Sequence, residues 1–243
     1  MTALFKKEIR SFLHSLIGYL VMGVFLLING LFLWVFPTDF NIPDFGYASL
    51  DGLFIMAPFV FLFLVPAVTM RSFAEEQRSG TMELLLTKPL TDMQIIGAKF
   101  LAGLALVLLS LLPTLVYFIS VYRLGLPPGN LDTGGIAGAY AGLFLLSAAF
   151  VAIGLFSSSL TDNQIIAFIL AVLLSGFMYI GFDFIFSLSL FGPADLLIQQ
   201  LGIETHYQSI SRGVIDTRDL LYFASLIALF LGLTRLSLSS RKW

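Results

Sequence analysis

Residues 90–96 read LTDMQII and residues 160–166 read LTDNQII, so the chain carries nearly the same heptapeptide twice. Each copy stands at the start of a long apolar run. In each copy the threonine and the glutamine three residues later fit a capping box, in which the two side chains bond to each other's backbone amides at a helix N-terminus. The aspartate after the threonine complements the helix dipole. Each copy therefore predicts the start of a helix. Similar caps explain the repeat better than an ancient internal duplication, because no longer self-similarity surrounds it.

The composition predicts an integral membrane protein. The 243 residues are 58% hydrophobic and 12% charged, whereas typical soluble domains are about half apolar and a quarter charged. The chain has no cysteine, which excludes disulfides and thiolate metal sites. A net charge of −2 gives no indication of nucleic-acid binding. No cleavable signal peptide is expected, because the apolar run that begins near Ser15 is too long for the apolar core of one.

Six apolar runs are long enough to cross a membrane, since a spanning helix needs about 20 such residues. They are roughly residues 15–36, 50–70, 95–121, 134–157, 164–186 and 220–238. If the N-terminus lies inside, three basic residues are outside: Arg123, Arg212 and Arg218. Ten are inside: Lys6, Lys7, Arg10, Arg71, Arg78, Lys88, Lys99, Arg235, Arg241 and Lys242. The positive-inside rule therefore predicts that both termini are cytoplasmic and that both heptapeptides begin helices at the cytoplasmic face.

Two flanking segments have amphipathic patterns. Residues 1–14 place Phe5 and Phe12 on one helix face and Lys7 and Arg10 on another, which predicts a helix in the plane of the membrane interface. A simple positively charged anchor is the compatible alternative. Residues 187–217 predict two short outer helices, which either plug the outer end of the bundle or gate a substrate.

Residues 71–89, RSFAEEQRSGTMELLLTKP, are the most highly charged stretch of the chain. Gly80 is expected to end a helix that continues out of the second span. Thr81 can cap a second helix, with Glu83 in its first turn, and this helix ends before Pro89. Three leucines at 84–86 need a surface to pack on, which favours a short helix across the cytoplasmic end of the bundle over a solvated hairpin.

Polar side chains inside the predicted spans are sparse. Asn29 lies in the middle of the first span and is a candidate for an interhelical hydrogen bond, worth roughly 0.6–2 kcal/mol. A polar residue at this depth is also a candidate for a transport pathway, although packing is the favoured role. Asp183 lies near the outer edge, and His14 and His206 are isolated, so no metal site is predicted. No G-x-x-x-x-G-K-[ST] motif occurs, so neither ATP binding by a P-loop nor a resident cofactor is expected.

Three segments in order, RSGTMELL at 78–85, KPL at 88–90 and IGAK at 96–99, resemble the permeases of ABC-2 type transporters. The resemblance extends over nearly the whole chain. It implies an all-α, type V exporter-like permease fold of six transmembrane helices, with an N-terminal interfacial helix, a cytoplasmic coupling helix and outer re-entrant or amphipathic helices. Residues 206–216 and 218–223 are similar to the subgroup that holds the gliding-motility permeases and the permease for nitrous-oxide-reductase maturation. The gliding permeases are the favoured members.

The resemblance also implies roles for particular residues. The coupling helix maps to residues 73–87 and docks on a separate P-loop ATPase subunit. The polar contacts and the bend that serve this docking are assigned to Glu75, Glu76, Arg78, Gly80, Thr81 and Glu83. Six spans form half of the usual permease, so a second copy, or a related membrane subunit with an extracytoplasmic domain, is implied.

The resemblance further implies a non-enzymatic subunit of the bacterial cytoplasmic membrane, serving gliding motility or secretion. One alternative is an ABC-2 exporter for metal-enzyme maturation, lipid, drug or polysaccharide. Another is a scaffold that transmits mechanical motion and transports nothing. A secondary transporter is disfavoured, because no pairs of ionisable residues occur within the spans.

Overall fold

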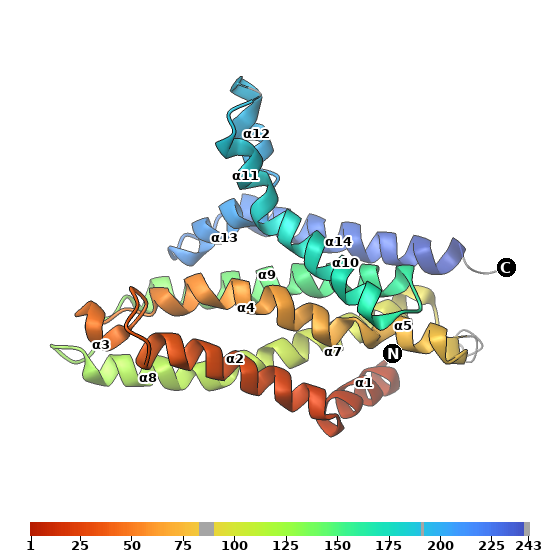
Figure 1. The fold of residues 1–243 in the computed structure, drawn as a ribbon, viewed down its shortest axis with the longest axis horizontal. Helices are drawn as coiled ribbons and strands as arrows, with labels where there is room; N and C mark the ends of the chain where they lie inside the picture. Colours follow the sequence, from red (N-terminus) through yellow and green to blue (C-terminus); the bar gives the residue numbers. More distant parts are fainter. Residues whose placement is uncertain (83–89, 191, 241–243) are drawn as a thin grey trace.

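The computed structural model describes residues 1–82, 90–190 and 192–240. These residues form helices and loops, without a strand among them. Among the described residues, six helical stretches are long and apolar enough to cross a membrane, and most of them lie side by side along the long axis of the molecule (Figure 1). They are α2 (Leu16–Trp34), α4 (Asp51–Thr69) with α5 (Arg71–Arg78), α7 (Asp92–Leu111) with η1 (Leu112–Thr114) and α8 (Leu115–Leu124), α9 (Thr133–Leu160), α10 (Gln164–Gly176) with η2 (Phe177–Gly181) and α11 (Phe182–Ser187), and α14 (Thr217–Ser240).

The remaining elements lie at the ends of these stretches. They are α1 (Thr2–His14), α3 (Ile42–Phe45), η3 (Gly192–Ala194), α12 (Asp195–Gln199) and α13 (Ile203–Ser211). The prediction of an all-α membrane protein with six transmembrane helices is therefore confirmed. Several helices extend past the predicted spans, and the third stretch runs from Asp92 to Leu124 rather than over 95–121.

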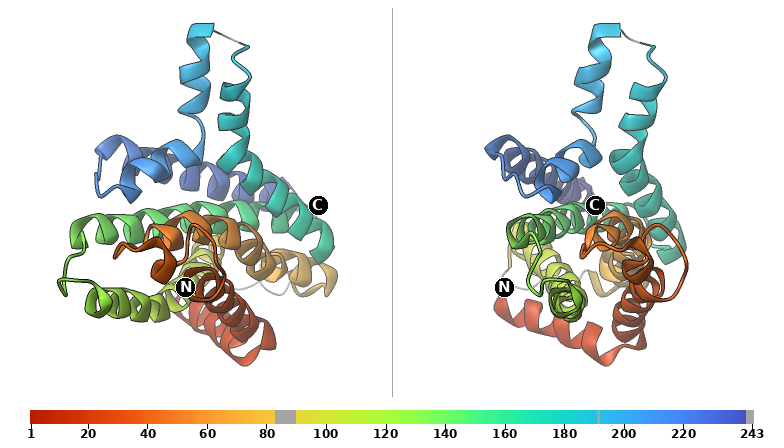
Figure 2. Two further views of the ribbon diagram at one scale, coloured as in Figure 1. Left: turned by 60° about the vertical axis from the view of Figure 1, so that its left-hand side comes forward. Right: turned by 90° about the vertical axis from the view of Figure 1, so that its left-hand side faces the viewer.

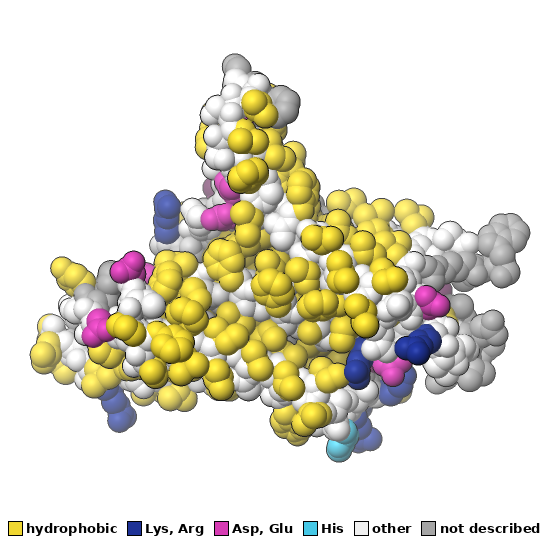
Figure 3. Space-filling view, viewed as in Figure 1, with side chains coloured by type: hydrophobic (Ala, Val, Ile, Leu, Met, Phe, Trp, Pro, Cys, Tyr) yellow, Lys and Arg dark blue, Asp and Glu magenta, His cyan; other side chains and the backbone are white. Residues whose placement is uncertain are grey.

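The two ends of the bundle differ in charge. We call the end that holds α1, α5 and the last turns of α14 the basic end, because seven of the described Lys and Arg residues lie there: Lys6, Lys7, Arg10, Arg71, Arg78, Lys99 and Arg235. Three lie at the opposite end: Arg123, Arg212 and Arg218. Figure 3 shows hydrophobic side chains covering the middle of the molecule between these ends. This division matches the separation expected of a chain that crosses a membrane.

Helix α9 is the centre of the bundle, and small residues let its neighbours approach closely. A Cβ added to Gly154 would meet the hydroxyl and Cβ of Thr69 on α4, and one added to Gly103 of α7 would lie 2.8 Å from Val151. Most of α9 is buried by α4, α7, α10, α13 and α14. Small residues at helix contacts are the usual means of association in membranes, where helices gain little from the hydrophobic effect.

The two heptapeptides differ in how they begin their helices. Thr91 and Gln94 form the predicted capping box at the start of α7. The second prediction is wrong in its register, because Asn163 is the N-cap of α10 and its side chain accepts from the amides of Ile165 and Ile166. Helix α9 continues to Leu160, so the residues after it are needed to reverse the chain. Asparagine is as good an N-cap as threonine, and the helix therefore begins after the turn.

Helices α1, α11 and α12 do not run along the bundle. Helix α1 lies across the basic end, and α11 with α12 forms a hairpin that projects away from the other helices (Figure 2). A π turn, Phe177–Gly181, lies where the fifth stretch leaves the bundle. Of the two predicted outer helices, α13 packs on α9 and α14, while α12 packs on α11. The expected cover of the opposite end is therefore formed by α13 and not by α12.

Candidate functional site

Helix α5 projects from the end of α4 and is held by a serine of the central helix. Helix α4 ends at Thr69 and α5 begins at Arg71, and the Oγ of Ser158 accepts hydrogen bonds from the amides of Phe73 (3.0 Å) and Ala74 (3.1 Å). The same hydroxyl donates to the carbonyl of Met70 at 2.9 Å. A break in a helix leaves backbone groups without partners, and these must be satisfied when they are buried. Ser158 bonds to three backbone groups of this first turn, of which the Phe73 amide has no partner within α5, and so ties the start of α5 to α9.

A buried cluster of charges joins α5 to two other helices. Lys99 Nζ on α7 lies 3.1 Å from Glu8 Oε1 on α1 and 3.0 Å from Glu76 Oε1 on α5. The Lys99 side chain is only 2% exposed. It also lies 5.2 Å from the ring centroid of Phe73. Lys7 reaches the same Glu76 oxygen from the solvent side, at 3.5 Å.

The energetics of this cluster make it a fixed joint. Two carboxylates share one lysine in a region that excludes most water, so the loss of Lys99 would leave both of them without their principal counter-charge. Breaking such a pair from one side typically costs about 3–5 kcal/mol, even where the intact pair adds little to stability. Glu8, Glu76 and Lys99 therefore hold α1, α5 and the start of α7 as one unit.

The predicted coupling residues separate into two groups. Glu75, Arg78, Gly80 and Thr81 are exposed at the tip of α5 and just beyond it. Gly80 has φ +68°, a left-handed conformation that favours glycine, so the expected bend is present. Glu76 faces inward, with its side chain 14% exposed. Glu83 and the leucines at 84–86 lie outside the described residues.

Two members of the charge cluster, Glu8 and Lys99, were given no role by the sequence. Lys99 was part of the IGAK segment, and Glu8 lies among lysines on α1. The one available signal was that Lys99 follows the start of a spanning helix by two turns, where a charge needs a partner. Its partners come from distant parts of the chain, so their identity required the fold.

Asn29 does not form the interhelical bond considered for it. Its side chain is fully buried, and Nδ2 donates to the carbonyl of Phe25, one turn earlier on the same helix, at 2.8 Å. Its Oδ1 is buried without a hydrogen-bond partner. Asn29 is therefore packed inside the bundle on α2, and only its Oδ1 could still accept a hydrogen bond from another group.

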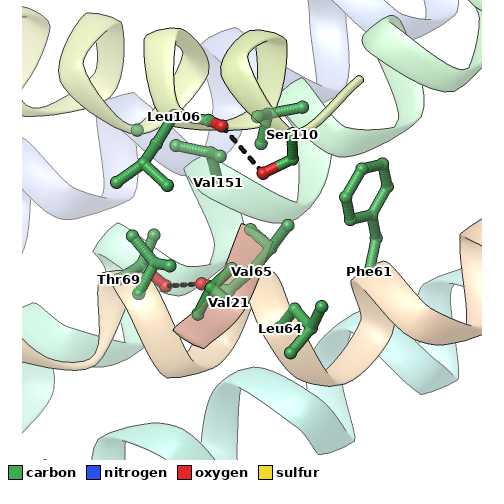
Figure 4. Close-up of a pocket in the computed structure, with 11 residues that line it drawn as sticks. Val21, Phe61, Leu64, Val65, Thr69, Leu106, Ser110 and Val151 are labelled. Atoms are coloured by element: carbon green, nitrogen blue, oxygen red, sulfur yellow. Dashed lines mark hydrogen bonds between the residues drawn. The ribbon is translucent and has the colours of Figure 1, made fainter. Parts of the chain in front are cut away.

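A small apolar gap lies between α2, α4, α7 and α9 (Figure 4). Its volume of about 10 Å³ is at the lower limit for a single water molecule. The hydroxyls of Thr69 and Ser110 at its edge donate to carbonyls of their own helices, at Val65 and Leu106. The gap therefore offers no free polar group to a solute.

At the opposite end, His206 ties α13 to the first turn of α14. Its Nδ1 lies 2.6 Å from Asp219 Oδ1, its Nε2 lies 2.9 Å from the carbonyl of Gln200, and its ring stacks on Tyr222. The sequence had shown His206 as isolated. No group of three or more His, Cys, Asp and Glu residues suited to a metal ion occurs in the part of the chain that the structure describes.

Comparison with known families supports a membrane transport protein. The family model described as "ABC-2 family transporter protein" matches residues 35–203, which is more than half of the chain. The matched region begins at the end of α2 and continues to the start of α13, so it includes α5, Glu76 and Lys99. No match was found among curated proteins.

Proposed function

The chain belongs to the ABC-2 family of transporter proteins, and we propose that it is the membrane subunit through which a separate P-loop ATPase drives movement of the spanning helices. The observation that carries this proposal is the joint formed by Glu8, Glu76 and Lys99. A projecting helix transmits force only if it is rigidly attached to the elements it moves. The joint attaches α5 to α1 and α7, and Ser158 attaches it to α9.

We assign the ATPase contact to the exposed tip of α5 and the segment that follows it. Glu75, Arg78, Gly80 and Thr81 are exposed there, and Glu83 follows them in sequence. Both signs of charge are present, which suits specific polar pairing with a partner. Glu76 takes a different role, because its carboxylate is already engaged inside the protein. Glu76 fixes α5 to α7 and does not contact the ATPase directly.

The proposed orientation places the basic end in the cytoplasm. The positive-inside rule supports this, because the basic end holds more of the described Lys and Arg residues than the opposite end does. Helix α1 then lies at the cytoplasmic membrane surface, where an amphipathic helix with lysines on one face is stable. The membrane is the bacterial cytoplasmic membrane, with both termini inside.

Within the family, the resemblance of residues 206–223 supports the gliding-motility permeases, of which GldF is the representative. The subunit then pairs with a second copy or with a related membrane subunit that has an extracytoplasmic domain. The apolar gap of Figure 4 and the self-bonded hydroxyls of Thr69 and Ser110 favour a mechanical role over passage of a hydrophilic solute through the bundle. An exporter of an apolar or lipid-like molecule is the second candidate.

The experiment is purification from native membranes in mild detergent, with identification of the co-purifying proteins. We expect a small P-loop ATPase whose recovery falls strongly for the charge reversal E75K/R78E. The matched control is D39K/R123E, which reverses one exposed acid and one exposed base at the opposite end. Equal ATPase recovery with both double variants would contradict the assigned contact, and the absence of an ATPase after crosslinking would contradict the function.

A further inference from the structure

A large cavity opens at the opposite end of the bundle, far from the proposed ATPase contact. It lies between α4, α9 and α13, beside Tyr179 of the π turn, and has a volume of about 790 Å³. Small-molecule sites are typically ~300–1,000 Å³. A second hollow of about 350 Å³ adjoins it and shares Glu204, Gln208 and Arg212 with it. We refer to the two together as the α13 cavity.

One wall of the α13 cavity is apolar and aromatic. Phe54, Ile55 and Phe59 of α4 line it, and Phe59 meets Tyr179 edge to face with ring centroids 5.7 Å apart. Tyr207 is fixed in place, because its hydroxyl donates to the carbonyl of Phe54 at 2.6 Å. The wall therefore presents a preformed apolar surface with aromatic rings, which suits the body of an amphipathic molecule and can also receive a cation.

The other wall has an excess of negative charge. Four carboxylates line the cavity: Asp51, Asp132, Asp183 and Glu204. Among the described residues, Arg212 is the one cationic side chain in its lining. No salt bridge joins Arg212 to any of the four carboxylates in the described part of the chain. Such a lining raises the local concentration of cations and repels anions.

Two of these carboxylates, Asp183 and Glu204, form no salt bridge with a cationic side chain among the described residues. Gln199 donates to Asp183 Oδ1 at 3.0 Å, and Gln208 donates to Glu204 Oε1 at 2.9 Å. Asp183 Oδ2 is buried, and the residues that the structure describes offer it no hydrogen-bond donor. Burial, and then the charge of the nearby Asp183, raise the pKa of Glu204. Neutral amides solvate the pair in part, and Arg212, which lines the same hollow, forms no salt bridge with either carboxylate in the described part of the chain.

We propose that the α13 cavity binds an amphipathic organic cation. The apolar body lies against Phe54, Ile55 and Phe59, and the positive charge faces Asp183 and Glu204. Tyr179 lies between the two regions, since it touches Phe59 and lines the same cavity. The binding site needs neither ATP nor an ATPase subunit. This cation site goes beyond the proposed function. An experiment that contradicts the cation site does not contradict the coupling to an ATPase, and the reverse also holds.

The test compares two probes that have the same shape and opposite charge. The full chain, purified in detergent, is titrated with tetraphenylphosphonium and separately with tetraphenylborate, and heat release is measured by calorimetry with empty micelles subtracted. We expect the cation to bind at least about tenfold more tightly than the anion. Equal binding of the two ions would show attraction to apolar surface alone and would overturn the proposal.

The variants locate the binding. D183N/E204Q removes two charges and keeps the shapes, and we expect it to weaken binding of the cation at least about tenfold. D39N removes an exposed acid at the same end of the molecule but outside the cavity, and should bind as wild type. Asp51 is exposed and its side chain makes no hydrogen bond among the described residues, so D51N keeps the fold even if D183N/E204Q does not. A twofold to threefold loss is expected for D51N, and wild-type affinity in D51N or in folded D183N/E204Q would overturn the proposal.

Discussion

Lys99 Nζ lies 3.0 Å from Glu76 Oε1, and this contact joins a spanning helix to the helix that projects from the basic end. The Lys99 side chain is 2% exposed and that of Glu76 is 14% exposed, so the pair is inside the protein although Glu76 comes from the most highly charged stretch of the sequence. A charged contact in this position costs desolvation and adds little net stability. Its value is geometric, because it fixes the direction of α5 relative to α7.

Replacement of Lys99 by methionine should destabilise the protein by about 3–5 kcal/mol, because Glu8 and Glu76 then lose their buried counter-charge and keep only the longer contacts to the exposed Lys7. Thermal unfolding of the purified protein in detergent measures this. K6M makes the same change at an exposed lysine of α1 and should leave the unfolding temperature close to that of wild type. The triple variant K99M/E8Q/E76Q should recover much of the loss, since it removes the unpaired charges as well. If K99M unfolds at the same temperature as K6M, the cluster is not a structural joint.

Ser158 and Ser157 are adjacent, fully buried serines whose replacement by alanine should have different effects. S158A removes the acceptor of the Phe73 amide, which is too near the start of α5 to have an intrahelical partner, and one acceptor of the Ala74 amide, so it should cost about 1–3 kcal/mol. The Ser157 hydroxyl donates to Ile153 of its own helix, whose carbonyl already has an amide partner, so S157A should cost less than about 1 kcal/mol. Hydrogen exchange of α5 should rise in S158A alone. The same exchange in both variants would show that Ser158 does not hold α5.

Gly154 and Gly23 are helical glycines for which an alanine should act in opposite directions. A Cβ at Gly154 would collide with Thr69, so G154A must push α9 away from α4 and should cost roughly 1–3 kcal/mol. No atom lies within 4 Å of a Cβ placed on Gly23, so G23A should be neutral or stabilise α2 by up to about 1 kcal/mol. Unfolding temperatures measured side by side decide the matter. A stable G154A protein would mean that α4 and α9 are not in close contact.

The sequence predicted the spanning helices because their signal is local. Apolar length marks a span, and the Thr91–Gln94 capping box marks the start of α7 within one residue. The second heptapeptide did not predict the start of α10 correctly. Helix α9 ends only at Leu160, so the residues directly after it form the turn, and Asn163 becomes the N-cap of α10. Periodicity alone could not show this, because the outcome depends on where the preceding helix stops.

The candidate site was predictable only in its exposed half. The charge density of residues 71–89 predicted an exposed polar segment, and in the part of it that the structure describes Glu75 and Arg78 are exposed. The role of Glu76 was not visible, because its inward direction depends on Lys99 and Glu8, which lie far from it in the chain. Ser158 likewise became important only through its contacts with the backbone at the start of α5. Contacts between distant segments decide these roles.

Single cysteines should report the orientation without ambiguity, because the chain contains no cysteine of its own. Thr133 begins α9 at the opposite end, and Ser79 follows α5 at the basic end, and both are exposed. In intact cells an impermeant maleimide should label T133C and spare S79C, and both should react once the membrane is permeabilised. Labelling of S79C and protection of T133C in intact cells would reverse the orientation proposed from the positive-inside rule.

The raised pKa of Glu204 should make the stability of the protein depend on pH. The folded protein holds a proton on this carboxyl at pH values where the unfolded chain, with an ordinary value of 4.5, has lost it. Stability from this group is therefore greatest at low pH and falls as pH rises from 4.5 to the higher folded pKa. The charged and titratable groups that share the cavity are Asp51 of α4, Asp132 at the start of α9, Tyr179, Asp183 of α11, and Tyr207 and Arg212 at α13.

The measurement is the difference between wild type and E204Q in unfolding temperature across this pH range. Subtraction removes the contributions of the other carboxyls, and wild type should lose stability relative to E204Q as pH rises. The affinity for tetraphenylphosphonium should change in the opposite direction, because the ionised Glu204 attracts the cation and the protonated form does not. Tight binding at high pH, together with a pH-independent affinity in E204Q, is the expected pair of results. A wild-type affinity that does not change with pH would mean that the cation is held without Glu204.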